Sequence, residues 1–587
     1  MKKIYQIFIL CFFIQFSNHL NGQDNNIKHV TSKALKEQVY IHYNSNLLFV
    51  GEYIHYTMYC TYLKNQEPSS ISKIGYVALV GKGNKVIVRQ KVRLVDGLGR
   101  GDFFIPVSVP TGNYKIIGYT NWMKNNKSTS FFEGDIALIN PYQNKQNIDF
   151  VAEENLVSNN PGVVNNISSN NSIDVKLSKK VYKQRSKVNV SLFPTQIHTN
   201  GNYSVSVYKK NSIILNKSDF LNNYKDFKTE EANYIDLVKE NNISLPELRG
   251  ELIKGAIKTT DTSLPIQNIS VSISIPSSNG YFLKFSKTNN KGEFEFILDK
   301  EYDAANAIIQ VISKNAEDYK LTMLPHTGVD LSNLIYKKPR IPYSANQLIL
   351  NRSIHNQIEN AYFELKPDSI LIHKNSEPFT MDNKIVYRLD DYTRFKTVKE
   401  TLIEVIDNVW SKKINNDKYV FQVRMENKAY DYFELPEIKA LVLVDGVVIQ
   451  DHTIMMDYDA RKIESISLLK RKYVYGEEVY QGIIEIFTKK RDFKLSNPNS
   501  GILNHNLFKP TQEIIYYKPK YEKNDINKHI PDFRYQLLWE PNITFKDLKT
   551  KEIEFYTSDV KGSFTLTLKG FTDNGKEVSV KKDFIVE

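Results

Sequence analysis

Short runs in which apolar and polar residues alternate recur along most of this chain and constrain its fold more than any other feature. Clear examples cover 39–43, 53–59, 75–80, 85–89 and 114–119, with Gly, Pro and Asn between them. A period of two places every second side chain on the same face of a β-strand. Short strands at this spacing, separated by turn residues, predict β-sandwiches.

The N-terminal residues 1–23 predict a secretory signal peptide. A basic start at Lys2 and Lys3 precedes an apolar run over 4–16, and a polar stretch follows. The apolar run is shorter than the roughly 20 residues of a membrane-spanning helix. An uncleaved anchor is the alternative. We expect export and a mature chain that begins near Asp24 and carries no transmembrane segment.

Cysteine and charge content narrow the function further. Cleavage removes Cys11 and leaves Cys60 alone, which excludes an intrachain disulfide. We expect Cys60 to be a small buried residue, with a reactive or intermolecular thiol as the alternative. The charge of the chain bears on its partners. The chain has 78 Lys and Arg residues and 66 Asp and Glu residues, which gives a net charge of +12. These basic residues are scattered, without an arginine-rich block, so we expect no nucleic-acid partner.

A family resemblance appears in the first β-rich region. The run from Gly97 to Pro106 is followed by Pro110-Thr-Gly112 and then by Tyr119-Thr-Asn-Trp-Met123. Together these motifs resemble the macroglobulin-type (MG2-like) sandwich of large exported Bacteroidetes proteins, which implies such a domain over 24–142. The Cys-Gly-Glu-Gln thioester of covalent macroglobulin traps does not occur in the sequence.

Composition and hydrophobic pattern predict linkers and further β-units after residue 142 and at the C-terminal end of the sequence. The Asn/Ser-rich stretch 143–170 predicts a linker, and 215–247 a polar linker or insertion. A second macroglobulin-like β-unit is expected over 171–214 and a C-terminal one over 532–587. The last is small for an independent core, so it should pack on a neighbour or pair with an earlier segment.

Residues 248–330 resemble a carboxypeptidase-regulatory-like, prealbumin-like β-sandwich. The motif is an alternating run up to Ile275 followed by Gly292-Glu-Phe294-Glu-Phe296. Gly292 suits a positive-φ turn, and the two phenylalanines share one face. This resemblance implies no catalytic residues. In Bacteroidetes receptors such a module often precedes a plug domain.

The central region predicts a mixed domain. Helical spacing predicts a helical connector over 331–384, and Thr397 with Glu400 predicts a capping box. The apolar run ending in Asp445-Gly446, then Tyr475-Gly476 and Gly482-Ile-Ile, resembles the plug domain of TonB-dependent outer-membrane receptors, here over 385–493 and without a barrel. A connector is expected over 494–531.

The resemblance makes five residues candidates for contact with a partner: Asp445, Gly446, Tyr475, Gly476 and Gly482. The segment Glu477 to Gln481 departs from the plug-domain pattern, because it lacks the small residues usual at that place.

No motif indicates catalysis or metal binding. The carboxylates of interest are Asp390, Asp391 and Asp445. Capping of helix starts and turns is enough to explain why aspartate occurs at these positions. A catalytic pair or a cation site is the alternative. His42, His55 and His452 stand singly, and no metal-ligand spacing or nucleophile motif occurs. We therefore expect no catalytic residues, no cofactor and no metal.

The expected fold is multidomain and mainly β, with tandem Ig/macroglobulin-like and prealbumin-like β-sandwiches plus one α+β plug-like domain. The resemblance implies a non-enzymatic protein of the periplasm or outer membrane whose plug-like domain contacts an outer-membrane barrel, transporter or translocon from the periplasmic side. The alternative is a thioester-less macroglobulin-like protein that interacts with proteases or protects against them. The sequence identifies no small-molecule ligand.

Overall fold

The computed structural model describes residues 35–587, except for gaps at 127–130, 144–148, 152–171, 197–198, 211–242, 278–279, 303, 338, 372–383, 416–417, 425–437, 476–477, 496–499, 522–528 and 546–548. The predicted signal peptide and most of the segments 143–170 and 215–247 therefore lie outside the described residues. Within the described ranges, no helix has the length and apolar character needed to span a membrane.

The chain is multidomain and mainly β, and it folds as two units assembled from distant segments. Unit 1 contains Met1–Leu248, Gly328–Leu371 and Pro510–Glu587. Unit 2 contains Arg249–Thr327 and Ile372–Lys509. The backbone therefore passes between the units four times, and each unit contains segments that are far apart in the sequence.

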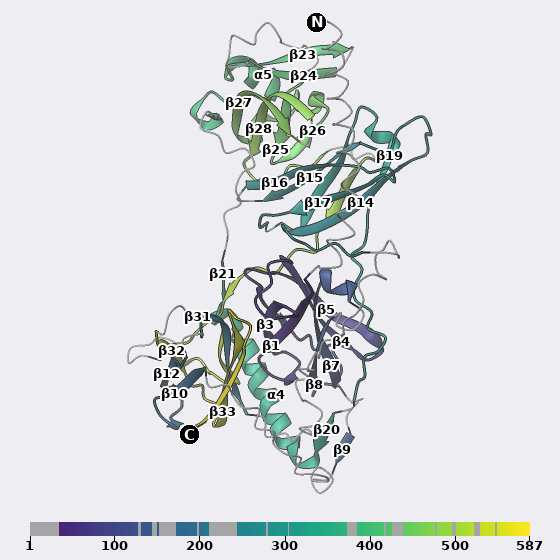
Figure 1. Cartoon of the computed structure of the whole chain (residues 1–587). Coiled ribbons are helices and arrows are strands. Elements are labelled where there is room, and N and C mark those ends of the chain that lie inside the picture. The colour runs from purple at the N-terminus through teal and green to yellow at the C-terminus, as the bar shows by residue number, and fades with distance from the viewer. Residues whose placement is uncertain are drawn as a thin grey trace, which may run out of the picture. The chain divides into compact units, whose positions relative to one another are not determined.

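The first sandwich of unit 1 has a three-stranded sheet in the order β1-β3-β6 and a five-stranded sheet in the order β2-β8-β7-β4-β5 (Figure 1). Its strands are β1 Glu37–Tyr43, β2 Leu47–Phe49, β3 Tyr53–Tyr62, β4 Ile74–Gly81, β5 Lys85–Arg93, β6 Leu98–Phe104, β7 Gly112–Thr120 and β8 Phe132–Ile139. Short 3-10 turns, η1 Lys82–Asn84 and η2 Trp122–Asn125, follow β4 and β7.

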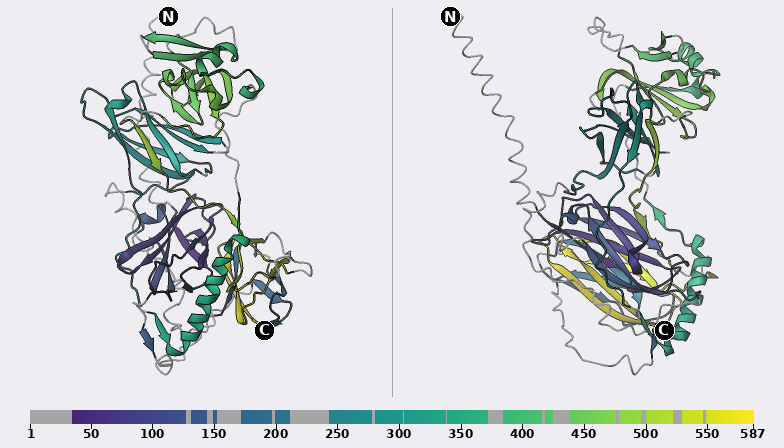
Figure 2. Two further views of the ribbon diagram at one scale, coloured as in Figure 1. Left: turned by 180° about the vertical axis from the view of Figure 1, so that it is seen from behind. Right: turned by 90° about the vertical axis from the view of Figure 1, so that its right-hand side faces the viewer.

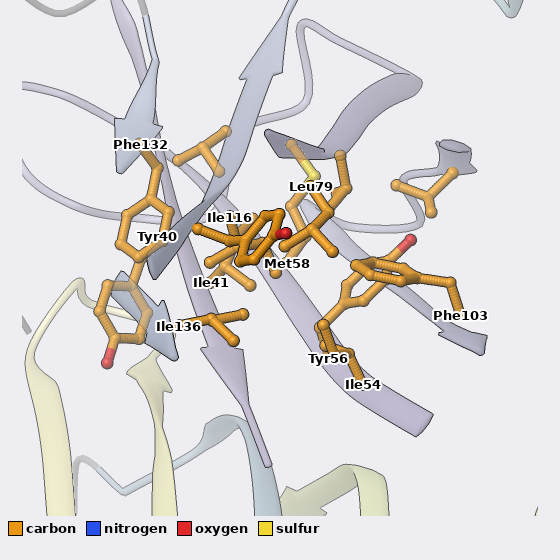
Figure 3. Close-up of a cluster of buried hydrophobic side chains, with 14 of the residues drawn as sticks. Tyr40, Ile41, Ile54, Tyr56, Met58, Leu79, Phe103, Ile116, Phe132 and Ile136 are labelled. Carbon is orange, nitrogen blue, oxygen red and sulfur yellow. The ribbon is translucent and has the colours of Figure 1, made fainter. Parts of the chain in front are cut away.

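Alternating side chains from both sheets fill this sandwich. Ile41, Met58, Leu79 and Ile116 meet in its centre, and the ring of Tyr40 lies beside Phe132 (Figure 3). Cys60 is buried in the same core, as the alternation predicted. Burial of this much apolar surface is what holds such a sandwich together without a disulfide.

The second sandwich of unit 1 combines an internal segment, residues 173–209, with the C-terminal segment, residues 536–586. Its sheets have the orders β10-β12-β32 and β11-β34-β33-β13-β31. The strands are β10 Ile173–Leu177, β11 Val181–Tyr182, β12 Lys187–Pro194, β13 Gly201–Lys209, β31 Gln536–Phe545, β32 Lys551–Tyr556, β33 Gly562–Thr572 and β34 Glu577–Val586. The segments 171–214 and 532–587, which the sequence analysis treated as two β-units, thus form one sandwich. Strand β13 is central because it pairs with both β31 and β33.

Helix α4 Asn346–Ala361 lies against the strands of unit 1 in both views of Figure 2. The 3-10 turns η6 Tyr343–Ala345 and η7 Phe363–Leu365 flank it. Two short ladders complete the unit: β9 Asp149–Val151 with β20 Arg340–Pro342, and β21 Ser369–Ile370 with β30 Ile514–Ile515. Strand β9 falls inside the predicted linker 143–170, where three residues suffice for a parallel pairing.

Unit 2 begins with a sandwich of sheets β17-β14-β19 and β16-β15-β18-β29. The strands are β14 Glu251–Thr259, β15 Ser270–Ser277, β16 Gly280–Lys287, β17 Glu293–Leu298, β18 Asn306–Ile312, β19 Tyr319–Met323 and β29 Ile502–Asn506, with η5 Ala316–Asp318 before β19. The segment 494–531, predicted as a connector, is therefore also part of this sandwich. It supplies β29, which pairs with β18, because the chain returns to this sandwich after the mixed domain.

The mixed domain of unit 2 has a five-stranded sheet in the order β22-β27-β28-β25-β26, in which β25 and β28 are parallel. Its elements are β22 Ile385–Arg388, η8 Leu389–Asp391, α5 Val398–Glu404, β23 Val409–Asn415, β24 Lys418–Val423, β25 Leu441–Val444, β26 Val447–Ile449, η10 His452–Met455, η11 Ala460–Lys462, β27 Ile463–Tyr475 and β28 Glu478–Thr488. The predicted capping box is confirmed: Thr397 accepts from the Glu400 amide, and the Glu400 side chain accepts from the Thr397 amide.

Candidate functional site

The predicted contact residues Asp445 and Gly446 form the turn between β25 and β26. Their φ angles of 49° and 81° match a tight hairpin turn that needs two positive values. The Asp445 carboxylate is buried, and it accepts hydrogen bonds from the amides of Thr488 at 2.8 Å and Phe493 at 3.2 Å. This aspartate therefore ties the turn to the end of β28.

The other predicted contact residues lie at internal contacts of unit 2. A Cβ on Gly446 would lie 2.2 Å from Cγ of Tyr281, and one on Gly482 would lie 2.6 Å from Cβ of Val423. The Tyr475 hydroxyl donates to a backbone carbonyl of β16, and its ring packs edge-on against Phe285 at 5.2 Å. Gly476 lies outside the described residues.

These contacts belong to an interface between the five-stranded sheet of the mixed domain and the sandwich of unit 2, called here the closed interface. Its apolar core consists of Tyr281, Leu283, Leu441, Leu443, Val448, Leu469, Tyr480, Ile483 and Phe487. The buried Glu485 carboxylate accepts from the Tyr281 hydroxyl and pairs with Lys384 at 2.6 Å. The opposite face of the sheet packs against α5 and β23–β24. Both faces of the sheet are thus covered within unit 2.

The remaining sequence candidates do not converge on one site. Asp390 is exposed and pairs with Arg394, whereas Asp445 is buried beside Thr488. The His42 ring lies 2.6 Å from the Ser204 hydroxyl, and His452 Nδ1 accepts from the Phe421 amide at 2.8 Å. No group of three or more His, Cys, Asp or Glu side chains in the described part of the chain is arranged to hold a metal ion.

Unit 1 contains a cavity of about 210 Å³, called here the aromatic pocket. It is bounded by the β2–β3 connection and β3 of the first sandwich, α4 and η7, and the chain segments that lead into and form β31. Its lining includes Glu52, Tyr53, His55, Tyr208, Asn356, Glu359, Phe363, Lys366, Asp368, Tyr516, Lys518, Phe533, Tyr535, Gln536 and Trp539. A shallower groove shares Gly51, Tyr53, Asn360 and Phe363 with it and continues past Phe104.

Aromatic rings form most of the pocket wall. The His55 ring lies between Tyr516, edge-on at 4.7 Å, and Trp539, nearly parallel at 6.0 Å. Tyr53 stacks on Phe363 at 6.0 Å at the entrance. Burial lowers the pKa of His55 to about 3, so this ring is neutral at physiological pH. The pocket therefore offers uncharged π surfaces, as ligand sites commonly do.

A buried ion pair fixes α4 beside this wall. Arg352 donates to both carboxylate oxygens of Glu52, at 2.9 and 2.7 Å, and its guanidinium lies 4.5 Å above the Phe49 ring. Burial alone lowers the pKa of Arg352, but Glu52 outweighs it and raises that pKa above its ordinary value. A second pair joins Lys366 to Glu359 at 2.8 Å. The pocket is therefore built on fixed, paired charges.

Three lining residues carry buried polar atoms that have no hydrogen-bond partner among the described residues. They are the indole nitrogen of Trp539, Nδ1 of His55 and Oε1 of Gln536. An unmade hydrogen bond in a buried site costs about 1–3 kcal/mol. An indole nitrogen can only donate, so Trp539, whose side chain is buried, carries an unused donor. The arrangement can bind a group that supplies the missing partners.

Sequence reasoning missed this pocket. It treated His55 as a single histidine and Trp539 as part of a strand, because the lining comes from residues 44–55, 208, 356–368, 516–518 and 533–539. The signal in the sequence was the density of aromatic residues near Tyr53 and Tyr516, which gives no pairing by itself.

No protein-family model matches the sequence, and no curated protein matches it significantly. Among solved structures, native Escherichia coli alpha-2-macroglobulin matches with 10% identity over 95% of this chain and 22% of that chain, at a TM-score of 0.14. The same protein activated by porcine elastase matches with 8% identity over 94% and 44%, at a TM-score of 0.24. Dimeric latent PorU from Porphyromonas gingivalis matches with 11% identity over 52% and 34%, at a TM-score of 0.15. This chain spans less than half the length of each of these proteins.

Proposed function

We propose that this chain is a non-enzymatic, exported protein of the cell envelope that binds a segment of another polypeptide in the aromatic pocket. The observation that carries this proposal is the unused indole donor of Trp539 in an otherwise well-packed aromatic wall. The pocket volume of about 210 Å³ suits one large side chain rather than a drug-sized ligand. A buried aromatic socket for a single anchor residue is a common form of protein recognition.

The pocket chemistry favours binding over catalysis. None of the described residues that line it is Ser, Thr or Cys. Its lysines and Arg534 are held by carboxylates: Lys366 by Glu359, Lys518 by Glu540 and Arg534 by Asp532. Within the described ranges, His55 Nδ1 has no hydrogen-bond partner, so no carboxylate there orients the ring as a general base. These features support a site without covalent or acid–base chemistry.

For the partner, we propose an outer-membrane barrel protein, transporter or translocon, contacted from the periplasmic side, with the plug-like domain contributing. Because both faces of its central sheet are covered, that contribution would come from the outer surface of α5 and β23. Ile403, Trp410 and Ile414 are exposed large apolar side chains there.

A pull-down with matched variants tests the pocket. Phe363 is 44% exposed at the pocket entrance, and Leu365 is 55% exposed on the same 3-10 turn but outside the lining. The tagged full chain, Phe363→Ala and Leu365→Ala are incubated with detergent-solubilised outer membranes from the source organism. We expect wild type and Leu365→Ala to recover the same barrel protein and Phe363→Ala to lose most of it. Equal recovery by all three, or recovery of no barrel protein, would refute the proposal.

The second candidate is a thioester-less macroglobulin-like protein that interacts with proteases or protects against them. The contact between the two sandwiches of unit 1 favours it, since Tyr208 and Phe571 of the second sandwich pack into the core of the first. The second sandwich joins residues 173–209 to residues 536–586, so a cut between these segments would change how the sandwiches are held together. Incubation with several proteases separates the candidates. Cleavage at one site followed by a conformational change would favour this second function, and general degradation would count against it.

A further inference from the structure

The charges around the aromatic pocket do not balance. Each basic side chain in its lining has a carboxylate partner, and Glu52 is held by Arg352. Asp368 at the rim accepts a hydrogen bond from the Tyr517 amide at 2.7 Å and pairs with no cation among the described residues. The pocket therefore carries a carboxylate whose charge is not neutralised within the described chain.

A second carboxylate lies behind the wall. Asp102 accepts a hydrogen bond from the hydroxyl of Tyr516 at 2.8 Å, and it too has no cationic partner among the residues described. Burial raises the pKa of Asp102 to about 6, the bond from Tyr516 lowers it, and the charge of Asp368 raises it again. Two carboxylates that repel each other beside neutral rings are stabilised by an incoming positive charge.

The ring geometry suits a flat cation. The His55 ring contacts Tyr516 and Trp539, at centroid distances of 4.7 and 6.0 Å, so the three rings form one continuous aromatic wall. A guanidinium stacks on aromatic faces and offers five donors in one plane. Oε1 of Gln536 is an unused acceptor in the same lining, and Nδ1 of neutral His55 accepts when the proton is on Nε2. The Trp539 indole is an unused donor suited to a backbone carbonyl of the ligand.

We propose, on the basis of the function proposed above, that the aromatic pocket receives an arginine side chain of an extended segment of the partner polypeptide. The rest of that segment follows the adjoining groove, whose lining includes Val50, Phe104, Val107 and Tyr142. Asp368 and Asp102 supply the attraction, and the rings supply the contact area. Apolar residues beside the arginine complement the groove.

Calorimetric titration of the full chain tests this proposal with acetylated, amidated pentapeptides Leu-Gly-X-Gly-Leu. We expect the peptide with Arg to bind at least tenfold more tightly than the one with Gln, and the one with Glu not to bind. If the peptide with Lys at X binds more tightly than the one with Arg, the pocket prefers an ammonium group, and the choice of arginine is wrong. Equal binding of the Arg and Gln peptides would overturn the proposal.

Charge variants give an independent readout. Asp368→Asn is expected to weaken the Arg peptide about fivefold, whereas Asp174→Asn, on β10 and outside the pocket lining, leaves it unchanged. In wild type the affinity rises between pH 5 and 7 as Asp102 loses its proton, and Asp102→Asn flattens that rise. The titratable groups around Asp102 are Asp368, His55, which lies opposite it in the β3–β6 register, and the tyrosines Tyr53, Tyr56 and Tyr516. Burial keeps His55 neutral and raises the pKa of the tyrosines, so none of these four changes charge between pH 5 and 7, and Asp368→Asn separates the contribution of Asp368.

The two proposals fail in different ways. If Phe363→Ala abolishes capture of the barrel protein but the Arg peptide neither binds nor competes with that capture, the arginine proposal is wrong and the binding function stands. If capture does not depend on Phe363, the proposed function itself is wrong.

Discussion

The two units of this chain each join two domains through a polar and aromatic contact region, and they complete it differently. At the closed interface of unit 2, Tyr281 and Lys384 satisfy the buried Glu485, and Gly446 allows the Tyr281 ring to lie against the turn. In the aromatic pocket of unit 1, Trp539 and His55 keep unpaired polar atoms. The chain therefore supplies the partner groups at the closed interface, whereas the aromatic pocket leaves polar atoms that a ligand can pair with.

The largest expected effect concerns the buried ion pair in each region. Arg352→Met leaves Glu52 without its cation, and Lys384→Met does the same to Glu485, so each should lower the free energy of unfolding by about 3–5 kcal/mol. Chemical denaturation measures both. Lys187→Met breaks the exposed pair with Glu554 and should cost less than about 1 kcal/mol. A loss that small at Arg352 would show that the pocket scaffold is not held by this pair.

Gly446 provides the next test, since it is required by the closed interface. Gly446→Ala places a methyl group against the buried Tyr281 ring at a positive φ, and we expect a loss of about 2–4 kcal/mol in the unfolding transition of unit 2. Gly83→Ala is the matched control: its φ is 73° and nothing lies within 4 Å of the added carbon. Its expected cost is about 1 kcal/mol. Equal losses would contradict the close contact at Gly446.

Lys569 is a buried lysine that, unlike Arg352 and Lys384, has no ion pair with a carboxylate among the described residues. Its amine donates to the Tyr40 hydroxyl at 2.7 Å. Burial lowers its pKa to about 8, with Glu577 acting in the opposite direction. Because the folded state disfavours the charged amine, stability should increase as pH rises from about 8 to 10.5. Lys569→Met should remove this dependence and stabilise the protein by about 2–3 kcal/mol at pH 7. Thermal unfolding across pH checks both, and destabilisation by Met at pH 7 would contradict them.

The smallest expected effect distinguishes a satisfied polar group from an unsatisfied one. Tyr281→Phe removes the hydroxyl bound to Glu485 and should cost about 1–3 kcal/mol. Trp539→Phe removes a donor that has no partner among the described residues, so its cost should come from the smaller ring alone, about 1 kcal/mol. If Trp539→Phe proves as costly as Tyr281→Phe, the indole has a partner and the comparison fails.

Local features of the fold were predictable from sequence because their causes are local. The alternation around Met58, the capping box at Thr397 and the turn at Asp445 each depend on a few neighbouring residues. The pairing of β13 with β31 and β33 was not predictable, because more than 300 residues separate strands that each satisfy the same pattern. The pocket shares that limit, since its walls come from segments that only the tertiary fold brings together.

The most direct test of the central claim is the indole nitrogen resonance of Trp539 in the ¹⁵N-labelled chain. The sequence has three tryptophans, and Trp539→Phe identifies the relevant signal. On addition of the pentapeptide with Arg, we expect the Trp539 signal to shift progressively to saturation while those of Trp122 and Trp410 stay in place. An unmoved Trp539 signal, or equal shifts of all three, would contradict an open pocket that awaits a partner.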